Sequence, residues 1–134
     1  MKTFFKMLTI LIVALIFSNA QAQTANPRAT YYYCGSHGMG WGVAGGERLT
    51  PQKAKVVRYI AVSRDLERRG FKLGMYVKVT SKYYPHLNGV WKIMDRMSSR
   101  VHNSIDFLLQ NKSDRKKMTM PRRVEIELLT SSTK

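Results

Sequence analysis

Acidic residues and cysteine are both scarce in this chain. Only 8 of its 134 residues are Asp or Glu, against 23 Lys plus Arg, and Cys34 is the single cysteine. One cysteine excludes an intrachain disulfide, so the hydrophobic core alone must stabilise the fold. The three histidines, His37, His86 and His102, lack metal-ligand spacing. We therefore expect neither a metal site nor a cofactor.

Long apolar runs are also missing, except at the N-terminus. Lys2 and Lys6 precede an apolar run from Met7 to Phe17, and Ala20-Gln21-Ala22 offers the small residues of a cleavage site. These features predict a secretory signal peptide over residues 1–22. The run is too short for a comfortable permanent membrane span. We expect an exported protein, periplasmic or secreted, with no stable membrane anchor after cleavage.

Basic residues are in large excess over acidic residues in this chain. The formal net charge is +15, or +13 once Lys2 and Lys6 leave with the signal peptide. Such a charge favours a polyanionic partner, for example a cell wall, an acidic glycan or a membrane surface; alternatively, it only keeps the protein soluble. The basic residues are dispersed, and no nucleic-acid-binding module is visible. We expect no nucleic acid partner.

Short β-branched and apolar runs predict an all-β domain with about six strands and short helical turns. The predicted strands cover residues 29–34, 56–63, 75–80, 90–94, 104–109 and 124–129. No long amphipathic helix separates them, which favours a small closed or half-closed β-barrel. Residues 29–130 would form one domain, preceded by a loose segment over 23–28 and followed by a tail over 131–134. We expect a monomer.

A glycine-rich segment follows the first predicted strand. Residues 35–46, "GSHGMGWGVAGG", hold six glycines, without the sequence context of a phosphate-binding loop. We interpret it as a long loop at the rim of a cleft, where Trp41 could stack on a sugar ring. A merely structural loop is the alternative.

Three of the few carboxylates lie at the edges of predicted strands. Asp65 follows "IAVSR", Asp95 follows "WKIM", and Asp106 lies inside "SIDFLL". Carboxylates that gather at a partly dry barrel end have raised pKa values and can act as general acids. The alternatives are a turn-capping role, above all for Asp65, and a buried ion pair of Asp106 with Arg96 or Arg100.

At these residues the sequence resembles a known family. The ordered segments "IAVSRDL", "GMYVKV", "GVWKIMDRM" and "NSIDFLL" look like the bacterial 3D domain, named for three aspartates. That module is similar to the C-terminal part of membrane-bound lytic transglycosylase A and to stationary-phase survival and resuscitation-promoting proteins. The resemblance covers roughly residues 29–129 and implies a six-stranded double-psi β-barrel.

The resemblance also implies roles for the aspartates. Asp65, Asp95 and Asp106 match the first, second and third family aspartates, and the third is the acid/base of the catalytic relatives. It protonates the oxygen between N-acetylmuramic acid and N-acetylglucosamine, and the 6-hydroxyl then attacks to leave a 1,6-anhydro end. The implied function is an exported lytic transglycosylase-like enzyme that cleaves peptidoglycan, with Asp95 supporting Asp106.

The sequence departs from the family after the second aspartate. Relatives carry a glycine-rich stretch there, whereas this chain has "RMSSRVHN" with Arg96 and Arg100. Arginine beside a carboxylate lowers its pKa and weakens a general acid; it could instead bind an anionic substrate, together with Trp41. Two alternatives therefore stay open: a non-catalytic barrel that binds the cell wall or another anionic glycan, and a cationic effector that binds nucleic acid or anionic lipid.

Overall fold

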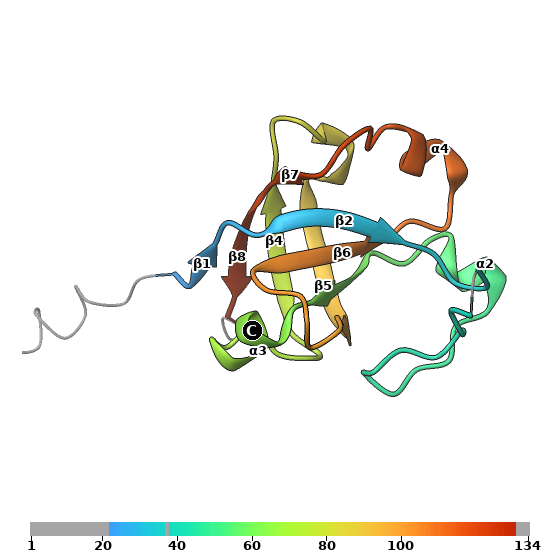
Figure 1. Ribbon diagram of the computed structural model, residues 1–134, viewed down its shortest axis with the longest axis horizontal. Coiled ribbons are helices and arrows are strands. Elements are labelled where there is room, and N and C mark those ends of the chain that lie inside the picture. Colours follow the sequence, from blue (N-terminus) through green and yellow to red (C-terminus); the bar gives the residue numbers. More distant parts are fainter. Residues whose placement is uncertain (1–21, 37, 131–134) are drawn as a thin grey trace, which may run out of the picture.

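The protein is mainly β, with short helices at the connections (Figure 1). The computed structural model describes residues 22–36 and 38–130; residues 1–21 of the predicted signal peptide and the tail over 131–134 lie outside them. In the described ranges, no helix has both the length and the hydropathy that crossing a membrane requires. The elements are β1 (Thr24–Ala25), β2 (Arg28–Tyr32), α2 (Pro51–Ala54), β3 (Tyr59–Val62), α3 (Arg64–Arg68), β4 (Tyr76–Thr80), the 3-10 helix η1 (Pro85–Leu87), β5 (Gly89–Arg96), β6 (Ser104–Leu108), α4 (Lys112–Lys116), β7 (Arg122–Arg123) and β8 (Glu125–Leu129).

Each of the six predicted strands has a counterpart: β2, β3, β4, β5, β6 and β8. The predicted start of the second strand, at Val56, is wrong. The Thr50 side chain accepts a hydrogen bond from the Lys53 amide (3.1 Å) and Pro51 occupies the first turn, so a helix, α2, begins there. The Val56 amide still bonds back to the Lys53 carbonyl (3.0 Å), which delays the strand to Tyr59. The segment over 23–28, expected to be loose, contains β1.

All strands belong to one mixed sheet in the order β1-β8-β4-β5-β3-β6-β2-β7. Two neighbouring pairs are parallel, β2 with β6 and β3 with β5, and the other pairs are antiparallel. Parallel partners cannot be joined by a hairpin, so each pair requires a long crossover connection. These crossovers bring residues that are distant in sequence onto neighbouring strands.

The two ends of this strand order are joined to each other. β1 pairs with β8 through Thr24 and Glu127, and β2 pairs with β7 through Arg28 and Arg123, in one antiparallel register. The Val124 amide donates to the Pro27 carbonyl between them (3.0 Å). The first and last strand pairs therefore form one continuous ladder that closes the sheet.

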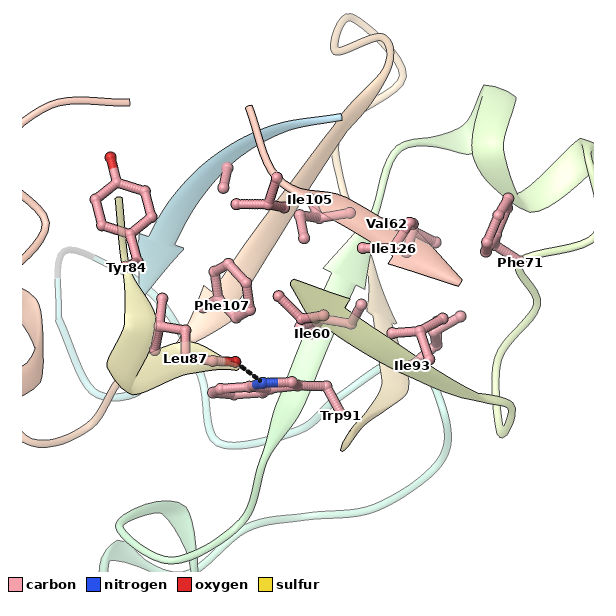
Figure 2. Close-up of a cluster of buried hydrophobic side chains, with 14 of the residues drawn as sticks. Ile60, Val62, Phe71, Tyr84, Leu87, Trp91, Ile93, Ile105, Phe107 and Ile126 are labelled. Carbon is pink, nitrogen blue, oxygen red and sulfur yellow. Dashed lines mark hydrogen bonds between the residues drawn. The ribbon is translucent and has the colours of Figure 1, made fainter. Parts of the chain in front are cut away.

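The larger hydrophobic cluster fills the interior of this closed sheet (Figure 2). Trp91 is 3% exposed, donates its indole N–H to the Leu87 carbonyl (2.7 Å) and packs edge-on against Phe107 at 4.8 Å between ring centroids. Strand residues that alternate toward this cluster include Ile60, Val62, Ile93, Ile105 and Ile126, all fully buried. The interior is a packed core without space for a ligand-sized molecule at these positions.

A second, smaller cluster covers the outer face of β2, β3, β5 and β6. Its buried members are Tyr32, Cys34, Val43, Leu49, Ala54, Tyr59, Ala61, Met94 and Leu108. The chain from the glycine-rich segment to α2 supplies several of them, so this segment packs on the barrel. The glycine-rich segment, predicted to be a long loop, therefore lies over the outer face of these strands.

Candidate functional site

A bulge in β5 sets the direction of Asp95. Trp91 and Ile93 point into the barrel core, so simple alternation would point Asp95 there as well. The pairing of β3 with β5 shifts, however: Ile60 faces Ile93, but the next residue, Ala61, faces Asp95. Met94 is the extra residue and packs in the outer cluster. The bulge thus turns Asp95 toward the outer face, as bulges beside functional sites do.

Asp95 and Asp106 lie on either side of the same alanine. Ala61 on β3 pairs with Asp95 on β5 and with Asp106 on β6, and Asp106 pairs in turn with Thr30 on β2. The two aspartates therefore do not come from adjacent strands, because β3 runs between β5 and β6. Their Cα atoms are two strand spacings apart, roughly 10 Å. The small Ala61 side chain leaves open space between the carboxylates.

Both carboxylates line one groove of about 320 Å³. Asp106 is largely buried there, and its Oδ1 accepts a hydrogen bond from the Thr30 hydroxyl (2.9 Å). Burial raises the pKa of Asp106 most, the Thr30 hydrogen bond lowers it and the nearby Asp95 charge raises it, so that the pKa is about 6. Asp106 therefore gains a proton close to neutral pH. The residues that line the groove are Tyr32, Met39, Ala61, Asp95, Arg96, Met97, Ser98, Val101 and Asp106.

Tyr32 adds a hydroxyl that the sequence did not single out. It lies two residues after Thr30 on β2, so it shares the outer face with the aspartates. Its buried hydroxyl has no hydrogen-bond partner among the described residues. Burial raises the Tyr32 pKa most, and the charges of Asp95, Cys34 and Asp106 and the closeness of the hydroxyl to the Asp95 carboxylate raise it further, so the hydroxyl stays protonated. The approach to Asp95 does not have the geometry of a hydrogen bond. A buried donor without a partner is costly unless a ligand supplies the acceptor.

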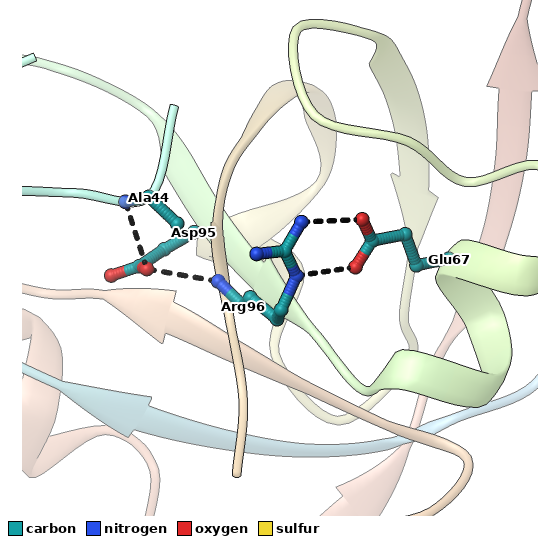
Figure 3. A network of polar contacts seen from close by, with 4 residues as sticks. All are labelled: Ala44, Glu67, Asp95 and Arg96. Atoms are coloured by element: carbon teal, nitrogen blue, oxygen red, sulfur yellow. Dashed lines mark hydrogen bonds and ion pairs between the residues drawn. The ribbon is translucent and has the colours of Figure 1, made fainter. Parts of the chain in front are cut away.

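Backbone amides of the glycine-rich segment donate hydrogen bonds to the bulge residues of β5 (Figure 3). The Gly45 amide donates to the Met94 carbonyl (2.8 Å), and the Ala44 amide donates to Asp95 Oδ1 (3.2 Å). The Arg96 amide donates to the same oxygen (2.9 Å). A Cβ atom on Gly45 would lie 2.8 Å from Met94 Cε and 3.1 Å from the Met94 carbonyl oxygen, so a larger residue here would require Met94 to shift.

Arg96 does not neutralise either groove aspartate through its guanidinium group. The guanidinium donates two hydrogen bonds of 2.6 Å to Glu67 on α3 (Figure 3). Arg96 donates to Asp95 through its backbone amide instead. Arg100 is exposed in the turn after β5 and is not a groove-lining residue. The alternative of an ion pair between Asp106 and Arg96 or Arg100 is therefore wrong. Among the described residues, no arginine guanidinium group forms an ion pair with Asp95 or Asp106.

Asp65 is separated from the other two aspartates. Both of its carboxylate oxygens accept the Asn103 backbone amide (2.9 and 3.1 Å), and it does not line the groove. Burial would raise the pKa of Asp65, but hydrogen bonds from Ser63 and Asn103 lower it overall. Asn103 has a positive φ of 42° directly before β6. Asp65 thus holds the turn that starts β6, in agreement with the turn-capping alternative.

The tryptophans and Cys34 lie outside the groove. Trp41 is half-buried against the outer cluster, beneath the start of the glycine-rich segment, and its sugar-stacking role stays a prediction. Trp91 belongs to the core and is not a groove-lining residue. Cys34 is buried, and its backbone bonds on both sides to the Gln110 amide group. The described residues contain no cluster of His, Cys, Asp or Glu that could hold a metal ion.

Comparison with solved structures identifies the type of fold. Clavibacter michiganensis expansin matches with a TM-score of 0.54 and 13% identity, over 84% of this chain and 53% of the expansin chain. A point mutant of that expansin, solved in complex with cellohexaose, matches with a TM-score of 0.52 and 12% identity, over 84% and 53%. A Streptomyces papain inhibitor matches with a TM-score of 0.54 and 13% identity, over 81% of this chain and 96% of its own.

These matches show an expansin-like β fold, and at such identities they show the fold alone. The chain spans about half the length of the expansins that it matches. No family model and no curated protein matches the sequence. Membership of the 3D domain family therefore stays a prediction. The more general prediction of a mainly β fold is confirmed.

Proposed function

We propose that this protein is an exported polysaccharide-binding barrel of the double-psi type, and that the groove between Asp95 and Asp106 holds a glycan chain. Two parallel strand pairs in a sheet closed by its first and last strands support the double-psi assignment. The expansin of similar fold, crystallised with cellohexaose, supports a glycan as the ligand. Peptidoglycan and other wall polysaccharides are the substrates to test first.

The unpartnered Tyr32 hydroxyl is the observation on which this proposal mainly rests. It lies in the groove with two carboxylates, so the site presents one donor and two strong acceptors. A sugar ring offers hydroxyl groups that can donate and accept at adjacent carbons. Such a ligand could bond to Tyr32, Asp95 and Asp106 together, whereas an apolar ligand would leave the Tyr32 hydroxyl without a partner.

Binding to purified sacculi and to neutral oligosaccharides tests the proposal. Wild type, Tyr32→Phe and Asp106→Asn are compared by pull-down and calorimetry, with Glu125→Gln on the exposed edge of β8 as the matched control. The two groove variants should bind about 5- to 30-fold more weakly, as expected for one or two lost hydrogen bonds. Equal binding by all four proteins would refute the proposed site.

A second candidate function is cleavage of the glycan, with Asp106 as general acid. The raised pKa of about 6 favours it, since a carboxyl group that is protonated near neutral pH can donate to a leaving oxygen. The proton would pass from the Asp106 carboxyl to the glycosidic oxygen as the C–O bond breaks. Asp95 would offset the positive charge that develops on the sugar. In a lytic transglycosylase reaction, the 6-hydroxyl of the same sugar then adds and returns its proton to Asp106.

Product analysis separates binding from cleavage. Sacculi are incubated with wild type and with Asp106→Asn between about pH 4.5 and about pH 7.5, spanning the Asp106 pKa, and soluble fragments are examined for 1,6-anhydro ends. Release by wild type alone, declining above about pH 6, supports the enzyme. Strong binding without any released fragment leaves the non-catalytic binding barrel as the function.

A further inference from the structure

A cationic depression adjoins the carboxylate groove. It is an open hollow lined by Arg64, Glu67 and Arg68 of α3, by Lys72 after it, and by Arg96 at the end of β5. Four of these five side chains are basic. Arg96 also lines the groove with Asp95 and Asp106, so the hollow and the groove are continuous at that residue.

The single carboxylate in the hollow is already engaged by Arg96. Glu67 accepts both guanidinium bonds of Arg96 at 2.6 Å. Hydrogen bonds from Arg96 lower the pKa of Glu67 most, and the charges of Arg64 and Lys72 lower it further, against the raising effect of burial. The described residues offer no ion-pair partner to Arg64, Arg68 or Lys72. These three basic side chains are exposed and available to an external anion.

The neighbouring groove limits what that anion can be attached to. Asp95 and Asp106 repel a negative group in the groove itself, so an acidic ligand must keep its anionic group away from them. The hollow lies on the far side of Arg96 from the carboxylates. A chain that fills the groove with uncharged sugar hydroxyls could place a carboxylate of the next sugar on α3.

We propose that the Arg64–Arg68–Lys72 surface is a subsite for the carboxylate of an acidic polysaccharide whose neighbouring sugar occupies the groove. This inference rests on the proposed glycan-binding function and adds the class of substrate. Glu67 holds Arg96 at the boundary between the two parts of the site. It keeps that guanidinium turned toward α3 and away from Asp95.

Affinity for a matched pair of oligosaccharides tests the subsite. The probes are a neutral hexasaccharide and a uronic acid hexasaccharide, and binding to all variants is measured by calorimetry at a salt concentration of about 0.15 M. Arg64→Gln/Arg68→Gln/Lys72→Gln should weaken uronate binding roughly 5- to 50-fold, as expected for three exposed charge contacts. It should change binding of the neutral probe less than about 2-fold. Glu67→Gln removes the competing carboxylate and should strengthen uronate binding roughly 2- to 5-fold.

A second triple variant controls for net charge. Lys112→Gln/Lys116→Gln/Lys117→Gln also removes three charges, at α4, which lies at the far end of the molecule from α3 (Figure 1). This variant should leave uronate binding within about 2-fold of wild type at a salt concentration of about 0.15 M, where distant charges are screened. Circular dichroism checks that both triple variants keep the wild-type fold.

Each contrary outcome has a distinct meaning. Equal losses in the two triple variants would overturn the subsite in favour of diffuse charge attraction, as would equal affinity of wild type for the two probes. Binding to phosphatidylglycerol vesicles is measured as well. If Arg64→Gln/Arg68→Gln/Lys72→Gln loses vesicle binding but keeps uronate binding, the surface binds lipid and the inference is wrong. Failure of the groove itself shows separately, as neutral-probe binding that is unchanged by Tyr32→Phe.

Discussion

The buried Asp106 carboxylate makes a quantitative prediction about stability and pH. Its pKa is raised from 3.8 to about 6, a shift of about 2 pH units, chiefly by burial. The folded protein therefore binds a proton between about pH 4 and pH 6 that the unfolded chain does not bind. The ionised group destabilises the fold by about 3 kcal/mol above that window, and the protonated group does not.

Replacing Asp106 by Asn removes this dependence on pH. The free energy of unfolding of Asp106→Asn, relative to wild type, should rise by about 2–3 kcal/mol between about pH 3.5 and about pH 7.5. Urea denaturation at four pH values measures the difference. Glu125→Gln, at an exposed carboxyl on β8, is the control and should show little such rise. If the difference in the free energy of unfolding between Asp106→Asn and wild type varies by less than about 0.5 kcal/mol across this range, the argument from burial is refuted.

Four further predictions concern the groove, the glycine-rich segment and the core. Thr30→Val should raise the Asp106 pKa above about 6, because the lowering hydrogen bond is lost, and Asp95→Asn should lower it; carboxyl NMR titration measures both. Tyr32→Phe should leave stability unchanged or raise it by up to about 1 kcal/mol, because the hydroxyl has no partner; a loss of about 2 kcal/mol or more in urea titrations would contradict this. Gly45→Ala should cost about 1–3 kcal/mol, since its Cβ would press on Met94, whereas Gly46→Ala, with no atom within 4 Å but a φ of 93°, tests backbone strain alone. Trp91→Ala should cost about 3–5 kcal/mol by thermal unfolding, and a fully folded variant at wild-type stability would contradict its place in the core.

The strands were predictable because their signals are local. Alternation in "MYVKV" and "VEIEL", and the apolar run in "SIDFLL", each depend on a few adjacent residues. The regions that were missed depend on capping and on pairing: α2 begins because Thr50 caps it, and β1 and β7 exist because each finds a partner about one hundred residues away. A Thr-Pro pair was the available signal for α2.

The candidate site was predictable in part for the same reason. Asp95 and Asp106 stood out as carboxylates beside apolar residues, and they do line one groove. Their separation by β3 was not predictable, because the β3–β5 pairing is parallel and joins distant segments. Nor was the bulge at Met94, which sets the direction of Asp95. The alternation of β2 could have indicated Tyr32, since it lies two residues from Thr30 on the same strand face. Only the strand register, which pairs Thr30 with Asp106, shows that this face adjoins the aspartates.

The ladder that joins the first and last strands also constrains how the chain acquires its structure. β1 and β2 have no antiparallel partners until the segment from Arg122 to Leu129 is present. A chain still being synthesised would therefore expose the edge of β2, and closure would need a contact across nearly the whole domain. Folding should therefore be slow, and closure of the sheet should depend on the strands that are synthesised last.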